Sequence, residues 1–174
     1  VLTMRLIAEE AREGTLELLL TSPITEAAIV IGKFLSAWAF YTLLLGLTLS
    51  YQIILASSTS PDAGVGISAY IGIWLYGGAT LAVGLVCSAL TDSQVVAAFL
   101  SVAALLLLYL GDFAGQIVAS LDVATIIRAV SLPGHYTGSF ALGLVRFEDI
   151  VYFAGFITVA LFITLRLVEG RRVR

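Results

Sequence analysis

The sequence is poor in the side chains that most enzyme and metal sites use. Its 174 residues include one cysteine, Cys87, and one histidine, His135. A single cysteine excludes a disulfide within the chain, and it excludes any CxxC or Cys/His cluster that could hold structural zinc. Redox chemistry between paired cysteines is excluded for the same reason.

Charged residues are scarce as well. Asp, Glu, Lys and Arg make up 12% of the chain, whereas soluble proteins contain about 25%. Apolar residues make up 60%, and the mean hydropathy is +1.05. A soluble domain of this size could not bury so much apolar surface. We therefore expect a lipid bilayer to surround most of the chain. The net charge of −3 and the lack of a basic patch predict no nucleic-acid partner.

Four stretches are long and apolar enough to cross a bilayer, which takes about 20 helical residues. They run over Ala27–Ala56, Ser68–Leu90, Val95–Gly111 and Ile150–Val168. The connection between the second and third stretches is short enough for an antiparallel helical hairpin. The predicted fold class is all-α, a polytopic transmembrane helix bundle that forms one domain over residues 1–174.

The stretch from Ala114 to Asp149 is more mixed, because Asp122 and Arg128 interrupt its apolar residues. We expect re-entrant or interfacial short helices here, on the outer side of the membrane and broken at Pro133-Gly134. His135 follows this break, and we expect it to be a solvated loop residue.

The positions of lysine and arginine predict the orientation, because these residues are retained on the cytoplasmic side. Both ends of the chain are basic, and four crossings place both ends on the same side. Two arginines fall in the third connection, and none falls in the Ser57–Gly64 loop. Both ends of this chain are therefore expected in the cytoplasm. The basic residues of the two ends are Arg5, Arg12 and Lys33, and Arg166, Arg171, Arg172 and Arg174.

Residues 1–25 differ from the rest and are expected to hold the end of a preceding span and a cytoplasmic segment. Gly14 ends a first helix, and Thr15 can cap a second helix of about two turns. Leu16, Leu19 and Leu20 form the apolar side of this second helix, and Glu17 lies near its positive end. Pro23 follows Ser22 and suits a first helical position.

Such a short amphipathic helix can lie in the lipid headgroup layer or dock on a protein. Helices that lie on membranes favour Lys and Arg, whereas this segment carries Glu9, Glu10, Glu13 and Glu17. A protein partner is the better fit.

Three runs of residues carry a family resemblance. They are Leu2-Thr3-Met4-Arg5-Leu6-Ile7-Ala8-Glu9-Glu10, Gly14-Thr15-Leu16-Glu17-Leu18-Leu19-Leu20-Thr21-Ser22-Pro23-Ile24, and Gly32-Lys33-Phe34. The chain resembles the permease subunit of a type-2 ATP-binding-cassette exporter, of the branch that includes the gliding-motility and nitrous-oxide-reductase maturation permeases. Weaker similarity covers Leu90-Thr91-Asp92-Ser93-Gln94 and the arginine-rich end.

The resemblance implies six spans in the full family fold, with the first two absent here and Val1–Met4 the tail of the second. It also implies that a coupling helix docks on a separate ATPase subunit. The coupling residues would be Gly14, Thr15, Leu16, Glu17, Leu19, Leu20 and Pro23. Two permeases, identical or different, would pair around the translocation path in the plasma membrane of a prokaryote.

The sequence contains no phosphate-binding loop of the form GxxxxGK[ST]. Gly32-Lys33 is followed by Phe34, and no glycine stands five residues before Gly32. We therefore expect no enzyme activity and no cofactor in this chain. ATP and magnesium would bind to the partner subunit.

Two other classes of membrane protein fit the sequence less well. Glu9-Glu10 resembles the paired glutamates of membrane proteases that process prenylated proteins. Those enzymes need histidines within the membrane, whereas this chain has only His135, which is predicted on the outer side of the membrane, far from Glu9. An ion-coupled transporter or channel would carry charges inside its spans. The charges nearest to the spans are Lys33, Asp112 and Arg166, and each lies near the end of a span.

Several residues within the spans are candidates for close packing or for the substrate path. Gly72, Gly77, Gly78 and Gly84 permit close approach of helices. The aromatic residues Trp38, Tyr41, Tyr70, Trp74 and Tyr76 fit a path lining, and they also fit interfacial anchoring and ordinary packing. No substrate-binding residue is assigned.

Overall fold

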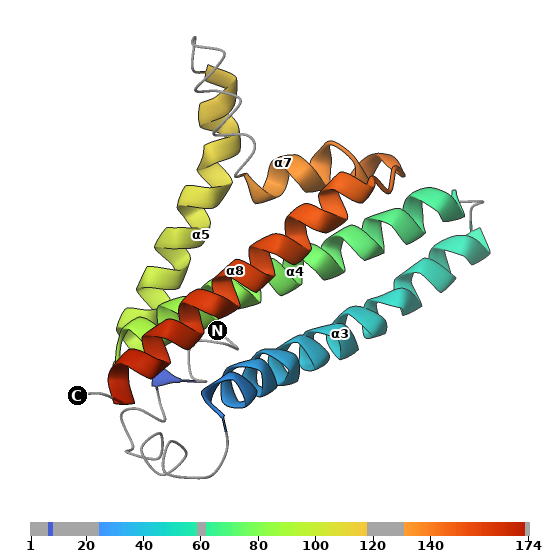
Figure 1. The fold of residues 1–174 in the computed structure, drawn as a ribbon. Coiled ribbons are helices and arrows are strands. Elements are labelled where there is room, and N and C mark those ends of the chain that lie inside the picture. The colour runs from blue at the N-terminus through green and yellow to red at the C-terminus, as the bar shows by residue number, and fades with distance from the viewer. Residues whose placement is uncertain (1–6, 9–24, 59–61, 118–130, 173–174) are drawn as a thin grey trace.

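The computed structural model describes residues 7–8, 25–58, 62–117 and 131–172, and the side chains of 112–117 and 171–172 are not described. These residues form helices and contain no β-strand (Figure 1). The predicted all-α class is therefore confirmed.

Four of the described helices are long and apolar enough to cross a membrane. They are α3 (Glu26–Ser58), α4 (Ala63–Leu90), α5 (Gln94–Ile117) and α8 (Phe147–Arg172). Each helix includes one of the stretches predicted from hydropathy and extends beyond it. At 33 residues, α3 is about 50 Å long, which exceeds the hydrocarbon core of about 30 Å. It must tilt or project beyond the core.

Polar side chains define where two of these helices begin. Thr25 Oγ1 accepts a hydrogen bond from Ala28 N at 3.3 Å before α3, and Asp62 Oδ1 accepts one from Gly64 N at 2.8 Å before α4. These contacts satisfy amides that have no partner within their own helix. The connection from α4 to α5 consists of Thr91–Ser93, as the predicted hairpin requires.

The helix α4 lies at the centre of the bundle and contacts α3, α5, α7, α8 and η1. Helix α4 has more buried than exposed residues, whereas α3, α5 and α8 have more exposed than buried residues among those whose side chains are described. Helix α3 begins, and α4 and α8 terminate, at the same side of the bundle, which we call the inner end. The opposite side is called the outer end. Helices α4 and α8 run parallel, side by side, and α5 diverges from them towards the outer end (Figure 1).

The outer end carries a short helix, α7 (Leu132–Thr137), and a 3-10 turn, η1 (Phe140–Leu142). The predicted break at Pro133-Gly134 is wrong, because both residues lie within α7. Proline has no backbone N–H group, and the N–H groups of a first helical turn have no partner within the helix, so proline is tolerated there. Ser131 Oγ accepts a hydrogen bond from Gly134 N at 3.4 Å. Together they start a helix.

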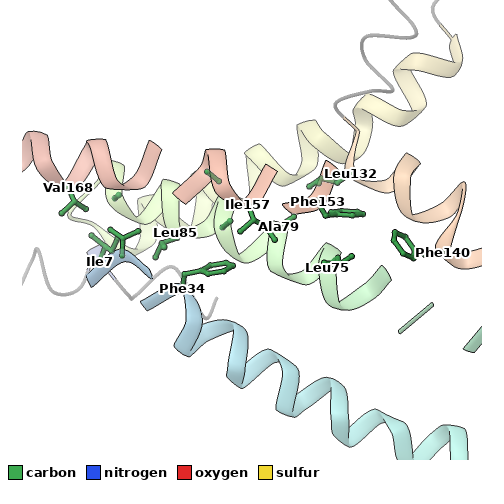
Figure 2. Packing of buried hydrophobic residues seen from close by; sticks show 14 residues of the cluster. Ile7, Phe34, Leu75, Ala79, Leu85, Leu132, Phe140, Phe153, Ile157 and Val168 are labelled. Atoms are coloured by element: carbon green, nitrogen blue, oxygen red, sulfur yellow. The ribbon is translucent and has the colours of Figure 1, made fainter. Parts of the chain in front are cut away.

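One cluster of buried apolar side chains runs along the bundle from its inner to its outer end (Figure 2). Ile7, Phe34 and Val168 lie at the inner end, and Phe140 lies at the outer end. The cluster joins Ile7, α3, α4, α8 and the outer elements into one packed unit.

Candidate functional site

The coupling residues predicted from the sequence, from Gly14 to Pro23, lie outside the described residues. The residues that flank them are described. Ile7 and Ala8 are buried. Ile7 lies at the inner end, near Phe34 of α3 (Figure 2), and the amides of both residues contact Ser88 close to the end of α4. Residues 9–24 are therefore joined to the bundle at its inner end on both sides.

The outer end contains a polar contact that the sequence did not reveal. His135 Nδ1 in α7 lies 2.7 Å from Asp149 Oδ1 in the first turn of α8. The imidazole also stacks on Tyr152, with ring centroids 3.8 Å apart and an interplanar angle of 17°. His135 is thus a packed helix residue, and the prediction of a solvated loop residue is wrong. The two partners are 14 residues apart and belong to different helices, so no helical period relates them.

Asp149 is the one charged residue that is buried among those whose side chains are described. Its Oδ2 atom is buried and has no hydrogen-bond partner among the described residues. Its place in the first turn of α8 puts it at the end of a span. A carboxylate there also interacts favourably with the positive end of the helix dipole.

The other charges near the spans lie at helix ends. Lys33 lies in the first third of α3. Arg166 pairs with Glu169 at 3.0 Å in the last part of α8, and both side chains are exposed. The Asp112 side chain lies outside the described residues.

The aromatic residues of α3 and α4 serve mainly to hold the two helices together. The rings of Trp38 and Trp74 stack with centroids 4.4 Å apart, and Tyr41 Oη donates a hydrogen bond to Ile73 O at 3.0 Å. Trp74 Nε1 donates one to Thr42 Oγ1 at 2.9 Å. These bonds satisfy polar groups inside an apolar environment. The ring of Tyr76 lies near those of Tyr136 and Phe153 instead.

A shallow groove of about 280 Å³ lies between α3 and α4. Two of the aromatic candidates, Tyr70 and Trp74, line it, and Trp38, Tyr41 and Tyr76 do not. The remaining lining residues are Thr42, Leu45, Gly46, Leu49 and Ile71. The surface that it presents is therefore almost wholly apolar.

Three of the predicted glycines of α4 are positions of close packing. A Cβ atom at Gly72 would overlap the side chain of Phe140, and one at Gly77 would overlap the ring of Tyr41. At Gly78 it would lie 3.1 Å from atoms of both Ile157 and Trp38. Gly84 is buried. Small residues thus let α3, α8 and η1 approach the backbone of α4.

Long apolar helices with apolar outward surfaces, small residues at the helix contacts of α4 and charges near the helix ends define a polytopic α-helical membrane protein. The sequence pattern of the ABC-2 family transporter proteins matches residues 1–127. The chain therefore belongs to the ABC-2 transporter family, and it is a permease component of an ABC transporter, an assembly that includes an ATPase. This confirms the resemblance at the level of the family. The matched residues include residues 9–24, for which a coupling role is predicted, and α3, α4 and α5, whereas α7, η1 and α8 lie beyond them.

A search of curated proteins and a search of solved structures each found no match.

Proposed function

We propose that this chain forms the translocation path of an ATP-driven exporter and moves when a separate ATPase subunit binds and hydrolyses ATP. The position of Ile7, Ala8 and the start of α3 carries this proposal. All three lie at the inner end of the bundle, so the chain enters and leaves residues 9–24 at the same end, which in this proposal is the end that the ATPase approaches. Movement of this segment would act on α3 directly, through the chain.

The residues of the segment suit a docking role. Glu17 offers a charge to the partner, and Leu16, Leu19 and Leu20 offer an apolar face. Burial of three leucine side chains in a groove of the ATPase would contribute about 2 to 5 kcal/mol when well packed. The resemblance to the gliding-motility and nitrous-oxide-reductase maturation permeases supports the same assignment.

We also propose an arrangement for the assembly. A second permease subunit, identical or different, completes the path, and ATP and magnesium bind to the ATPase. This chain supplies no catalytic residue and no cofactor site. Both of its ends face the cytoplasm, and the assembly lies in the plasma membrane of a prokaryote. The positive charges at the inner end, Lys33 and Arg166 among them, support this orientation.

The test uses the intact permease co-expressed with its ATPase. Glu17→Arg and Leu19→Asp should each leave the permease inserted in the membrane and monodisperse in detergent. Each should strongly reduce the amount of ATPase that co-purifies, and each should abolish transport.

Two control variants match these changes at other places. Glu169→Arg reverses a charge at the inner end of α8, and Leu142→Asp adds a charge at an exposed leucine of the outer end. Both should retain the ATPase. If Glu17→Arg and Leu19→Asp retain it as well and transport at the reference rate, the segment has no coupling role.

A further inference from the structure

Two buried serines of α4 hold segments at opposite ends of the bundle. At the inner end, Ser88 Oγ accepts hydrogen bonds from the backbone amides of Ile7, at 3.2 Å, and Ala8, at 3.0 Å. Ser88 and Ala8 have no exposed surface, and Ile7 is 1% exposed. We call this group of residues the inner contact.

The inner contact fixes the backbone that leads into the coupling segment. A hydroxyl oxygen can accept two hydrogen bonds, and here it accepts them from two consecutive amides, as a capping side chain does at a helix start. Ala8 is followed directly by residues 9–24. A displacement of that segment therefore reaches α4 through Ser88, as well as α3 through the chain.

The second serine acts at the outer end of the same helix. Ser68 Oγ donates a hydrogen bond to the backbone carbonyl of Phe140 at 3.0 Å, and this bond is buried. One turn further along α4, Gly72 lets the Phe140 side chain lie directly on the helix backbone. We call this group the outer contact.

The helix between the two contacts is continuous. Ser68 and Ser88 are 20 residues apart, which corresponds to about 30 Å along a helix and to the thickness of the hydrocarbon core. Paired glycines are common places for a helix to bend, and α4 contains Gly77-Gly78. Tyr41 packs directly against Gly77, and Trp38 and Ile157 pack closely against Gly78, which supports the helix at this point.

We propose that α4 transmits the movement of the coupling segment across the membrane to the outer elements α7 and η1, with Ser88 and Ser68 as the positioning residues at its two ends. This inference rests on the proposed function, because it assumes that an ATPase moves the coupling segment. Helix α4 suits the role because it contacts α7 and η1 as well as α3, α5 and α8. Helix α5 diverges from the bundle (Figure 1).

The test measures an outer response to a nucleotide bound at the inner side. The intact permease–ATPase complex, with Cys87→Ala and Leu142→Cys, carries an environment-sensitive fluorophore on Cys at position 142. Leu142 ends η1 and is 66% exposed, so the fluorophore can be accommodated there. The labelled complex without a further change is the reference. Its emission is measured without nucleotide and with Mg-ATP plus vanadate, and the same two measurements are made for Ser88→Ala and for Ser68→Ala.

Both serine variants should retain the bound ATPase and its ATP turnover but lose the outer response. The fluorophore is expected to report two states of the outer elements, one without nucleotide and one with Mg-ATP plus vanadate. In each serine variant, the nucleotide should change the equilibrium between these two states by a factor that is about tenfold or more smaller than in the reference. This difference corresponds to about 1.4 kcal/mol of coupling. Ser101→Ala is the matched control. Ser101 is equally buried, but its hydroxyl donates only within α5, to Ala97 O at 2.7 Å. This variant should respond as the reference does.

Each remaining outcome is decisive. An unchanged outer response in Ser88→Ala or in Ser68→Ala overturns transmission through α4. If Ser88→Ala does not fold, Ser68→Ala decides alone, because its contact lies on the side away from the ATPase. Loss of the response in Ser101→Ala as well also overturns the inference, because any buried serine would then have the same effect. A reference permease that binds no ATPase refutes the proposed function itself.

Discussion

The side chains of His135 and Asp149 join the outer helix α7 to the first turn of α8, with Nδ1 and Oδ1 2.7 Å apart. The histidine is 25% exposed and the aspartate 9% exposed at the level of the side chain. Ser139 Oγ donates a hydrogen bond to the backbone carbonyl of His135 at 2.7 Å, and this bond ties α7 to the residue before η1. The outer elements are therefore held to α8 by the contact between His135 and Asp149, and to α4 by the Ser68–Phe140 hydrogen bond and by the packing of Phe140 on Gly72.

Removal of either partner of this contact should destabilise the protein. His135→Ala deprives Asp149 Oδ1 of its partner in a buried setting, and we expect a loss of about 1 to 3 kcal/mol in the free energy of unfolding. Titration of the purified, intact protein with a denaturing detergent measures it.

The double variant His135→Ala/Asp149→Ala separates this contact from general packing effects. The free energy of unfolding should fall less in the double variant than the sum of the decreases in the two single variants, by about 0.5 kcal/mol or more. The reason is that the second change no longer leaves a buried charge without its partner. Losses that add fully would show that the two side chains do not interact.

Gly72 should tolerate no side chain. A Cβ atom there would overlap the side chain of Phe140, and overpacking of this kind costs about 1 to 3 kcal/mol. Gly72→Ala should therefore lower the free energy of unfolding by that amount in the same titration.

Gly155→Ala in α8 is the control for this change, because no atom lies within 4 Å of the added Cβ. Alanine also favours a helix over glycine by about 1 kcal/mol, so this variant should be neutral or slightly more stable. Equal losses for Gly72→Ala and Gly155→Ala would show that packing against Phe140 is unimportant.

Single cysteines at the two ends of the bundle test the orientation. Ser58 ends α3 at the outer end, and Asp92 lies between α4 and α5 at the inner end, and both are exposed. In a Cys87→Ala background, a membrane-impermeant maleimide should label Ser58→Cys in intact cells. It should label Asp92→Cys only after permeabilisation. The reverse pattern would place both ends of the chain outside.

The purified permease should not bind or hydrolyse ATP by itself, because its sequence contains no phosphate-binding loop. Binding of a fluorescent ATP analogue and release of phosphate measure the two properties. The complex with the ATPase serves as the positive control. Saturable turnover by the permease alone, free of contaminating ATPases, would contradict the assignment of ATP to the partner.

Much of the secondary structure could be predicted because a bilayer permits few solutions. Backbone groups in hydrocarbon must pair within the spanning element, so a long apolar run is a helix. Each of the four predicted stretches lies inside a helix of the structure. The outer region was harder, because Pro133-Gly134 signals a break in most contexts and a capping serine, Ser131, makes it a helix start.

The predicted coupling residues stay a prediction, because Gly14–Pro23 lie outside the described residues. The family follows from local runs such as Gly14–Ile24, since a run of this kind is read directly from the chain. The contacts of Ser88 and His135 could not be predicted, because their partners lie 81 and 14 residues away. For Ser88, the one signal in the sequence was a small polar residue in an otherwise apolar span. Such residues are also common at positions that make no contact with another segment.

The sequence by itself determined that the chain is a helical membrane protein, where its spans lie, and that it belongs to a transporter family. Only the tertiary structure decided that α4 is the central helix, that Trp38 and Tyr41 pack between helices while Tyr70 and Trp74 line a groove, and that Asp149 is buried. The reason is physical: lipid is as apolar as the protein core, so hydropathy does not distinguish an inward face from an outward one. Helices in a bilayer associate by close packing and hydrogen bonds at a few positions, and these depend on the three-dimensional fit of residues far apart in the chain.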